Sequence, residues 1–460
     1  MILIKLLEHI HNRNCKNNKN FYDNNLIDYS NIPLNFLNKL NAQLLDIGIT
    51  NYQSIIIYFK NQELFMTTLL SLDAFVLEIF LVNETEFEKE IKTPKGFHYV
   101  ITDVLIGSLI VAKTLKILTR TVYVYYGEKD SHSNLIETRY MFLTSGTSGQ
   151  SIKIYRSETT LIREALAIIK NLKLSNKDII LCNAPYFHSF GQAFGNFAAC
   201  FSGASIQYLP SLMLPMHIIK VLKEKKFNIL VTTPYYYNVI YKELSGLKYM
   251  LSAGGKLNED VINSGILINN VYGSTETGAI TIQQYANGGD CGSVGTPING
   301  VEIMLGNKII KINDISVHEI LVKSNFLYDQ KIVNNKKKKN EKEWYHTGDL
   351  GYFDKNNNLH IYGRNDGVLK INGKKISLIE IKTAIEKFEG IEEAKILHKV
   401  DSNNKIYIEA YVQCSQKCSE QQIISYCRSV LSADKIPRSI KIIEKFSRSE
   451  MGKIIYSQEE

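Results

Sequence analysis

A run of small hydroxyl residues and glycines follows a short apolar stretch in the first third of the chain. Residues 141–153 read MFLTSGTSGQSIK, and every position from Thr144 to Gly149 is Thr, Ser or Gly. Glycine lets the backbone approach a ligand closely, and the hydroxyl groups add hydrogen-bond donors beside the backbone N–H groups. This composition suits a loop that wraps a polyphosphate, although its spacing is neither that of a Walker A loop nor GxGxxG. An ordinary polar surface loop is the alternative.

Further stretches with chemistry-bearing side chains follow this loop in order. They are NAPYFHSFG (183–191), LSAGG (251–255), VYGSTETG (271–278), YHTGDLGYFD (345–354), GRNDGVLKINGKKISLIEIK (363–382) and SRSEMGKI (447–454). Together with the loop, this ordered set resembles the adenylate-forming superfamily, which comprises acyl-CoA synthetases, adenylation domains and luciferases. The resemblance covers nearly the whole chain, although the region ahead of the loop is short for that family.

The resemblance implies that ATP binds across several of these motifs. Joining a carboxylate to the α-phosphate of ATP brings two anions together, so such a site must neutralise charge and exclude water. The positions that match the family's ATP and AMP contacts are Thr144, Ser145, Gly146, Thr147, Ser148, Gly149, Ala253, Gly254, Gly255, Tyr272, Gly273, Asp349 and Arg364. In this assignment the loop holds the β- and γ-phosphates, Tyr272 lies against the adenine ring, and Asp349 with Arg364 binds the ribose hydroxyls.

Thr275 and Glu276, in the stretch YGSTE, match two further positions at the phosphates. Thr275 matches the position that contacts the α-phosphate. Glu276 matches the position that coordinates Mg²⁺, a hard cation suited to one carboxylate and several phosphate oxygens. Structural alternatives exist for the residues of this site: a solvated acid at Glu276, a core tyrosine at Tyr272 and a turn-forming acid at Asp349.

Lys453, near the C-terminus, matches the family's catalytic lysine, which bridges the incoming carboxylate and the α-phosphate. An ammonium on a flexible stem stabilises the charge that develops between those groups; the alternative is a solvated lysine. Asp366 matches the hinge about which the small domain turns. After that motion the residues expected to face the site for thioester formation, along the thiol tunnel, are Lys370, Asn372 and Gly373.

His188 indicates which acid is activated. Amino-acid-activating domains place an aspartate after the phenylalanine to pair with the substrate amine, whereas this chain has Phe187-His188, as acyl- and aryl-CoA ligases do. An α-amino acid would bury an unpaired ammonium, which is costly, so a fatty or aromatic carboxylate is expected. His188, Phe190 and Gly191 are the predicted acyl-pocket residues, with a structural histidine in a turn as the alternative. The phenylalanines at helical spacing up to Phe201 are expected to be mainly core.

Two acceptors of the acyl group fit the sequence, and a third interpretation involves no turnover. The first acceptor is CoA, and the second is the phosphopantetheine arm of a carrier protein in a biosynthetic pathway. The third interpretation is a non-catalytic ligand-binding relative. Its only support is that Ser151-Ile152 replaces the family's Pro-Lys, with Lys153 one place later. We expect an active enzyme.

The elements that must position these residues follow from hydrophobic periodicity. Helix–strand alternation over residues 31–82 and again over 158–252 indicates parallel strands joined by crossover helices. Glycines and short alternating strands over 288–363 indicate a β-rich lobe, and the Asn-Gly turn at 372–373 opens a small α+β unit. The prediction is an α/β protein with a large AMP-binding domain over residues 1–365. A small mobile α+β domain over 366–460 carries the catalytic lysine.

The overall composition argues against several other classes of protein. At 460 residues, with 45% hydrophobic and 22% charged side chains, the chain reads as a globular protein of more than one domain. Its net charge of +8 is not clustered with aromatics, so no nucleic-acid surface is expected. No apolar run reaches membrane-spanning length. The seven cysteines lack the paired spacing of a zinc site or disulfide framework, although Cys414 and Cys418 are spaced to share a helical face. We expect a cytoplasmic protein with reduced thiols.

Overall fold

The computed structural model describes most of the chain. The described residues are 22–23, 25–92, 96–128, 135–145, 151–224, 227–255, 257–286, 292–312, 315–333, 336–340, 343–371, 374–400, 406–416, 418–448 and 454. The chain divides into two compact units, Met1–Glu302 with Val322–Tyr345, and Ile303–Leu321 with His346–Glu460. The second unit thus takes in residues 346–365, ahead of the predicted boundary. The hinge predicted at Asp366 concerns a motion and stays a prediction.

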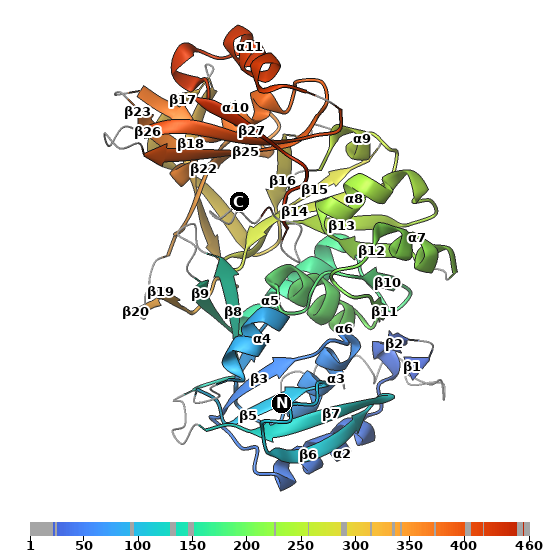
Figure 1. Ribbon diagram of the computed structural model, residues 1–460. Coiled ribbons are helices and arrows are strands. Elements are labelled where there is room, and N and C mark those ends of the chain that lie inside the picture. Colours follow the sequence, from blue (N-terminus) through green and yellow to red (C-terminus); the bar gives the residue numbers. More distant parts are fainter. Residues whose placement is uncertain are drawn as a thin grey trace. The chain divides into compact units, whose positions relative to one another are not determined.

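The first sheet of the first unit has parallel strands at its centre and antiparallel strands at its edges. Its strands are, in spatial order, β20 (Lys336–Lys339), β19 (Gln330–Val333), β9 (Ser151–Ser157), β8 (Arg139–Ser145), β4 (Glu78–Leu81), β3 (Ser54–Tyr58), β5 (Tyr99–Thr102), β7 (Arg120–Tyr126) and β6 (Val111–Ile117). The helices along this part of the chain are α2 (Leu34–Asp46), α3 (Glu63–Leu72) and α4 (Glu84–Glu90). The run β8-β4-β3-β5 is parallel, as the helix–strand alternation predicts, and Figure 1 shows β8 beside β9.

A second sheet of this unit carries most of the remaining motifs. Its strands are, in spatial order, β1 (Tyr22–Asp23), β2 (Leu26–Asp28), β11 (Ser205–Tyr208), β10 (Ile179–Cys182), β12 (Ile229–Thr232), β13 (Tyr249–Ala253), β14 (Ile268–Ser274), β15 (Gly278–Tyr285) and β16 (Ser293–Pro297). The helices are α5 (Glu158–Leu172), α6 (Ala198–Ser202), α7 (Pro215–Glu224), α8 (Pro234–Ile240) and α9 (Glu259–Ile262), with a π-helical segment at Gly191–Phe197. Strands β11, β10, β12, β13 and β14 are parallel, and β15 returns antiparallel to β14.

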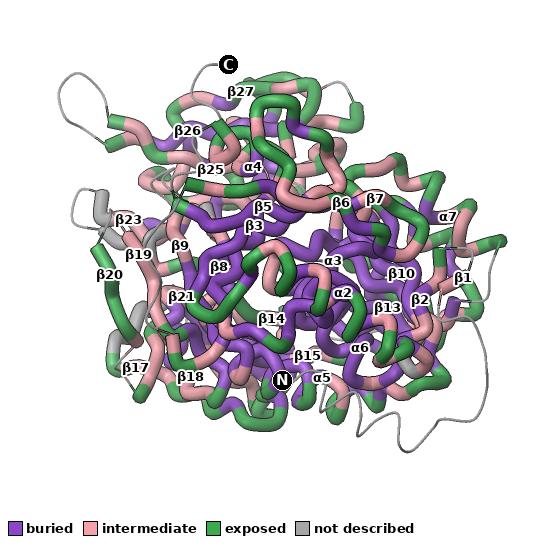
Figure 2. The backbone as a smooth tube through the Cα atoms, turned by 90° about the horizontal axis from the view of Figure 1, so that it is seen from below, coloured by how far each residue is buried: buried purple, intermediate pink, exposed green. Residues whose placement is uncertain are grey.

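The central strands of both sheets are buried. Leu181, Leu230, Met250 and Ile268, from four neighbouring strands, pack with apolar residues of α7 and α8 in one core. Figure 2 shows central strands such as β3 and β10 in the colour of buried residues. Parallel strands covered on both faces read as near-continuous apolar runs, which explains why the sequence predicts them. Among the described residues, no helix combines the length and apolar character needed to cross a bilayer.

The second unit is built from four neighbouring strands, a hairpin and a small α+β module. The four strands are β22 (Leu359–Arg364), β21 (Tyr345–Phe353), β18 (Ile315–Ser324) and β17 (Val301–Ile312), in spatial order. The hairpin and module comprise β23 (Val368–Ile371), β24 (Lys374–Ser377), α10 (Leu378–Ile385), β25 (Ile391–Val400), β26 (Ile406–Cys414), α11 (Glu420–Val430) and β27 (Ser439–Ile443). Helices and strands alternate beyond the hairpin, as the predicted small α+β unit requires.

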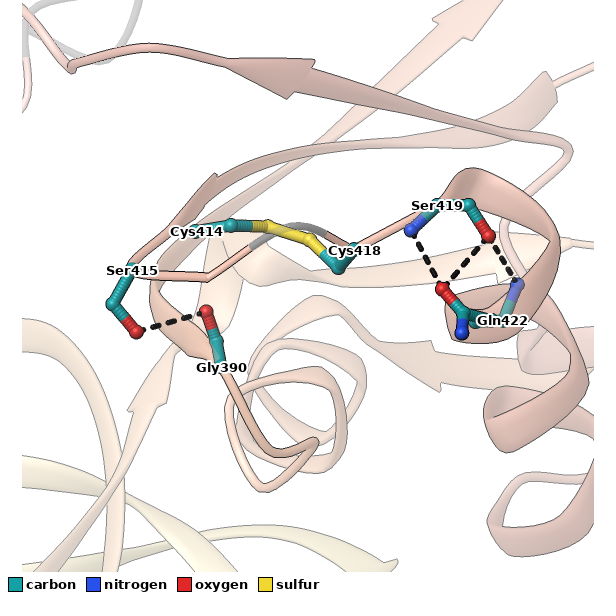
Figure 3. The surroundings of a disulfide bond; sticks show 6 residues. All are labelled: Gly390, Cys414, Ser415, Cys418, Ser419 and Gln422. Atoms are coloured by element: carbon teal, nitrogen blue, oxygen red, sulfur yellow. Dashed lines mark hydrogen bonds between the residues drawn. A yellow bond between two sulfur atoms is a disulfide. The ribbon is translucent and has the colours of Figure 1, made fainter.

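Cys414 and Cys418 form a disulfide, which corrects the expectation of unpaired thiols at these positions. Cys414 ends β26, and Cys418 directly precedes Ser419, the N-cap of α11, so the two cysteines flank a turn rather than share a helical face. Their Cα atoms are 6.8 Å apart. Figure 3 shows the bond beside the capping box in which Ser419 and Gln422 exchange hydrogen bonds.

Candidate functional site

The predicted phosphate loop is flanked by two paired strands of the first sheet. β8 ends at Ser145 and β9 begins at Ser151, and the pairs Thr144↔Ile152 and Ser145↔Ser151 close the base of the hairpin. Thr144 is half-buried. The loop residues Gly146–Gly149 and the side chain of Ser145 lie outside the described residues. The apolar lead-in to the loop is therefore a strand, and the chain returns antiparallel along it.

Lys153, one place beyond the position of the family's lysine, lies within β9. Its backbone pairs with Leu143 of β8. Its ammonium lies 6.0 Å from the ring centroid of Phe80, in the range of a cation–π contact. This contact accounts for the Lys153 side chain without a role at the phosphates.

The stretch between β14 and β15 forms a tight turn that presents Thr275 and Glu276. The Ser274 N–H donates to Thr277 Oγ1 at 3.0 Å, and the Thr277 N–H donates to Ser274 Oγ at 3.2 Å. At Gly273 an added Cβ would lie 2.2 Å from a backbone oxygen on the other arm of the hairpin. Glycine is therefore required at this position by close approach of the two arms.

Thr275 lies against the stretch that follows β10. The hydroxyl oxygens of Ser189 and Thr275 are 3.4 Å apart, so the motifs at 183–191 and 271–278 meet at this point. Thr275 and Ser189 are both half-buried. The sequence predicts a role for each motif in one site, and the fold of the first unit brings them together.

Glu276, the residue predicted to coordinate Mg²⁺, lies in the turn between β14 and β15. Its backbone carbonyl accepts a hydrogen bond from the Tyr328 N–H at 2.8 Å. Its side chain is half-buried at the turn. Burial and then the negative charge of Glu276 raise the pKa of Tyr328. The described residues contain no cluster of three or more acidic, histidine or cysteine side chains that would enclose a metal on their own. One carboxylate therefore fits Mg²⁺ that takes its other ligands from phosphates and water.

A row of buried polar side chains crosses the second sheet near the carboxyl ends of its parallel strands. Thr232 pairs with Ser252, and Ser252 pairs with Asn270. Asn183 directly follows Cys182, which pairs with Val231 in the neighbouring strand. Each of the four side chains is at most 8% exposed and has a polar atom without a hydrogen-bond partner among the described residues. Buried polar groups are normally paired, and ligands of open α/β sheets bind at this edge. The row therefore fits a polar ligand.

The LSAGG and VYG residues lie at the same edge of the sheet. Ala253 ends β13 and is buried, whereas Gly254, with a φ of +90°, and Gly255 are exposed. Tyr272 lies in β14, two residues beyond the buried Asn270, and is half-buried. These four residues are predicted from the sequence, whereas the row of buried polar side chains is not. The only signal of this row in the sequence is a single Asn, Thr or Ser near the end of each apolar run.

Asp349 and Arg364 lie opposite each other in the second unit. They are paired residues of β21 and β22, and Arg364 Nη1 is 3.3 Å from Asp349 Oδ1. The same nitrogen donates to the Thr347 carbonyl oxygen at 3.0 Å, and the Asp349 N–H donates to Thr347 Oγ1 at 3.0 Å. These contacts place a carboxylate acceptor beside guanidinium donors, the arrangement that a vicinal diol requires.

His188 lies just before the π-helical segment Gly191–Phe197. The His188 N–H donates to the Pro185 carbonyl oxygen at 3.1 Å, and the side chain is half-buried. At Gly191 an added Cβ would lie 2.1 Å from the Pro185 oxygen, so packing alone requires glycine there. Phe190 is buried against Phe194, with ring centroids 5.1 Å apart. The phenylalanines of this segment are core residues, as expected from their spacing.

Several residues predicted for the small domain lie outside the described part of the chain. They are Lys453, Asn372 and Gly373, together with the side chains of Asp366 and Lys370. The hairpin that the Asn-Gly turn predicts is present, because Ile371 pairs with Lys374 and the ladder of β23 with β24 continues from there.

Comparisons with known proteins identify similar chains. Residues 127–309 match the family model of AMP-binding enzymes. A 2-succinylbenzoate–CoA ligase of Listeria monocytogenes is 23% identical over 436 residues, which cover 90% of each chain. The o-succinylbenzoate–CoA synthetase of Bacillus subtilis with its acyl-adenylate intermediate has a TM-score of 0.73 at 17% identity, over 92% of this chain and 90% of that one. The same enzyme with ATP and magnesium ion has a TM-score of 0.70 at 17% identity, over 92% of each chain. The predicted fold class is confirmed.

Proposed function

We infer that the chain is a member of the adenylate-forming superfamily and an ATP-dependent ligase that joins a carboxylic acid to the thiol of CoA. The family model spans both the phosphate loop and the 271–278 turn. The observation that carries the proposal is the contact between Ser189 and Thr275, the residue directly before Glu276, at the carboxyl edge of a parallel sheet. Ligands bind at this edge in open α/β sheets, and the unpaired polar row provides partners for a nucleotide.

The first half-reaction transfers the adenylyl group to the acid. A carboxylate oxygen attacks the α-phosphorus of ATP, the bond to the bridging oxygen breaks, and pyrophosphate leaves with that electron pair. The Thr275 hydroxyl donates to an α-phosphate oxygen, and the Lys453 ammonium stabilises the charge shared by the carboxylate and the phosphate. Glu276 would hold Mg²⁺, which when bound would supply positive charge at the phosphate oxygens.

The second half-reaction transfers the acyl group to sulfur. The CoA thiol loses its proton to solvent, the thiolate attacks the acyl carbonyl carbon, and AMP leaves as the phosphate monoester. Rotation about Asp366 exchanges Lys453 for the hairpin of Lys370, Asn372 and Gly373 at the acyl-adenylate. Asp349 and Arg364 keep hold of the ribose hydroxyls through both steps.

The acid is proposed to be a fatty or aromatic carboxylate. His188 stands where amino-acid-activating relatives place the aspartate that pairs with the substrate amine, so an ammonium would remain unpaired. The neighbouring Phe187 is buried, and its ring centroid lies 5.0 Å from that of His188. The Listeria relative is named for an aromatic acid and for CoA, which supports this substrate class and acceptor.

Exchange of radiolabelled pyrophosphate into ATP tests the first half-reaction. The assay takes a panel of fatty, aryl and α-amino acids with Mg²⁺, and compares the native chain with Lys453→Ala, Glu276→Gln and the control Lys445→Ala, an exposed lysine eight residues earlier. Exchange with a fatty or aryl acid that is lost in Lys453→Ala and Glu276→Gln, but kept in Lys445→Ala, is the expected result. Exchange only with amino acids would overturn the substrate class, and none with any acid would overturn catalysis. CoA and holo-carrier protein, added in turn, then identify the acceptor.

A further inference from the structure

A buried ion pair of the first unit has no role in the chemistry described above. The side chains of Arg156 and Glu164 are 0% and 2% exposed, and Arg156 Nη2 lies 2.7 Å from Glu164 Oε2. The Nε and Nη1 groups of Arg156 have no hydrogen-bond partner among the described residues. A buried pair whose hydrogen bonds are incomplete contributes little to stability relative to apolar residues of the same volume. Its presence therefore calls for a geometric explanation.

Glu164 contacts the backbone that leaves the Thr275–Glu276 turn. Its Oε1 accepts a hydrogen bond from the Ala279 N–H at 2.8 Å. A Cβ at Gly278, where φ is +65°, would lie 2.8 Å from the carboxylate carbon of Glu164. Because Gly278 is two residues beyond Glu276, this carboxylate fixes the outgoing arm of the hairpin.

Arg156 supports the same turn through a second segment. Its Nη2 donates to the Phe326 carbonyl oxygen at 2.9 Å, and two residues later the Tyr328 N–H donates to the Glu276 carbonyl oxygen at 2.8 Å. The Asp329 N–H in turn donates to the carbonyl oxygen of the residue before Arg156, at 2.9 Å. The segment 326–329 is thereby held between β9 and the backbone of Glu276.

We propose that Arg156 and Glu164 are positioning residues that set the place of the Glu276 carboxylate. Arg156 lies on β9, the strand that leaves the loop, and Glu164 lies on α5, the helix that follows it. The pair thus joins β9 and α5 to the hairpin that carries Glu276. This inference rests on the proposed function, because it assigns Glu276 to Mg²⁺. Groups that orient a metal ligand from behind change metal affinity by roughly 10- to 100-fold when they are removed.

Binding of ATP to the full chain, measured by titration calorimetry over a range of Mg²⁺ concentrations, tests the proposal without turnover. The main variant, Arg156→Met with Glu164→Gln, removes both charges of the pair, so neither partner is left as an unpaired charge. The matched control is Arg139→Met with Glu78→Gln, which removes another Arg–Glu pair of the same unit, between β8 and β4. We expect the Mg²⁺ concentration that half-saturates ATP binding to rise about tenfold in the main variant alone. Metal-free ATP affinity is expected to stay unchanged.

The other outcomes overturn the proposal. An unchanged Mg²⁺ requirement in a folded main variant, or an equal rise in the control, would make the pair a structural element only. If the main variant fails to fold, Arg156→Lys takes its place, because lysine keeps the charge but loses the planar fork that reaches both Glu164 and Phe326. It is expected to raise the Mg²⁺ requirement severalfold, and a native value would refute positioning. A native chain that binds no ATP with or without Mg²⁺ would instead overturn the proposed function itself.

Discussion

Replacement of Gly273 by alanine is expected to disable adenylation by displacing the turn that carries Thr275 and Glu276. The added Cβ of Gly273→Ala would lie 2.2 Å from the Gly278 carbonyl oxygen. That distance is more than about 1 Å short of ordinary van der Waals contact, and both groups belong to backbone. The two arms of the hairpin must therefore separate, because no side chain is available to move aside.

The size of the effect follows from that separation. A shift of about 1 Å in a reacting group is enough for a rate loss of roughly 100-fold. Overpacking of this kind also lowers the free energy of unfolding by about 1–3 kcal/mol. Both effects are expected together, since both arise from opening the same turn.

The assay is the initial rate of pyrophosphate exchange with the best acid of the panel, combined with a urea unfolding curve. Gly107→Ala is the matched control, because a Cβ added at Gly107 would have no heavy atom within 4 Å, and it is expected to change stability by at most about 0.5 kcal/mol. If Gly273→Ala were destabilised but kept its exchange rate, the link between this turn and the chemistry would be refuted. Native stability together with native exchange would refute the packing argument itself.

Three further predictions concern pH, redox state and nucleotide binding. Burial and then the charge of Asp73 raise the pKa of Glu158 from 4.5 to about 7, so the folded chain keeps a proton that the unfolded chain releases. The free energy of unfolding should fall by about 3 kcal/mol as pH rises from 4.5 to 7, and urea titrations of Glu158→Gln should lack this fall; an equal fall would place the titration elsewhere. Dithiothreitol should lower the free energy of unfolding by about 2 kcal/mol through the Cys414–Cys418 bond, and an equal effect on the Cys414→Ser, Cys418→Ser double variant would contradict this. Asp349→Ala should raise the KM for ATP at least about tenfold, since hydrogen bonds to a charged group contribute about 1.5–3 kcal/mol; an unchanged KM would leave Asp349 a turn former.

Several elements of the fold were predictable because their signals are local. The strand at 54–58 is an uninterrupted apolar run, since it is buried on both faces. The hairpin around 372–373 follows from an Asn-Gly pair, which takes the positive φ angles of a tight turn. By contrast, the sequence did not predict β9. Ile152 and Ile154 alternate with more polar residues, but the alternation is short. Because it directly follows the loop, the stretch was assigned to the loop.

The disulfide shows where local spacing is ambiguous. A separation of four residues suits one face of a helix as well as the two ends of a turn. The choice depends on where β26 ends and α11 begins, and the cap at Ser419 sets the latter. Residue types alone do not specify that boundary.

By itself, the sequence determined the order of the motifs, the α/β class and the identity of the residues expected at ATP, because these depend on residue type and short-range spacing. The tertiary structure alone decided which side chains share one environment. The row from Asn183 to Asn270 exists only through strand register, and the contacts of Arg156 with Phe326 and of Glu164 with Ala279 join segments more than a hundred residues apart. Such contacts depend on how strands and helices pack, and packing is a property of the whole folded chain rather than of any stretch within it.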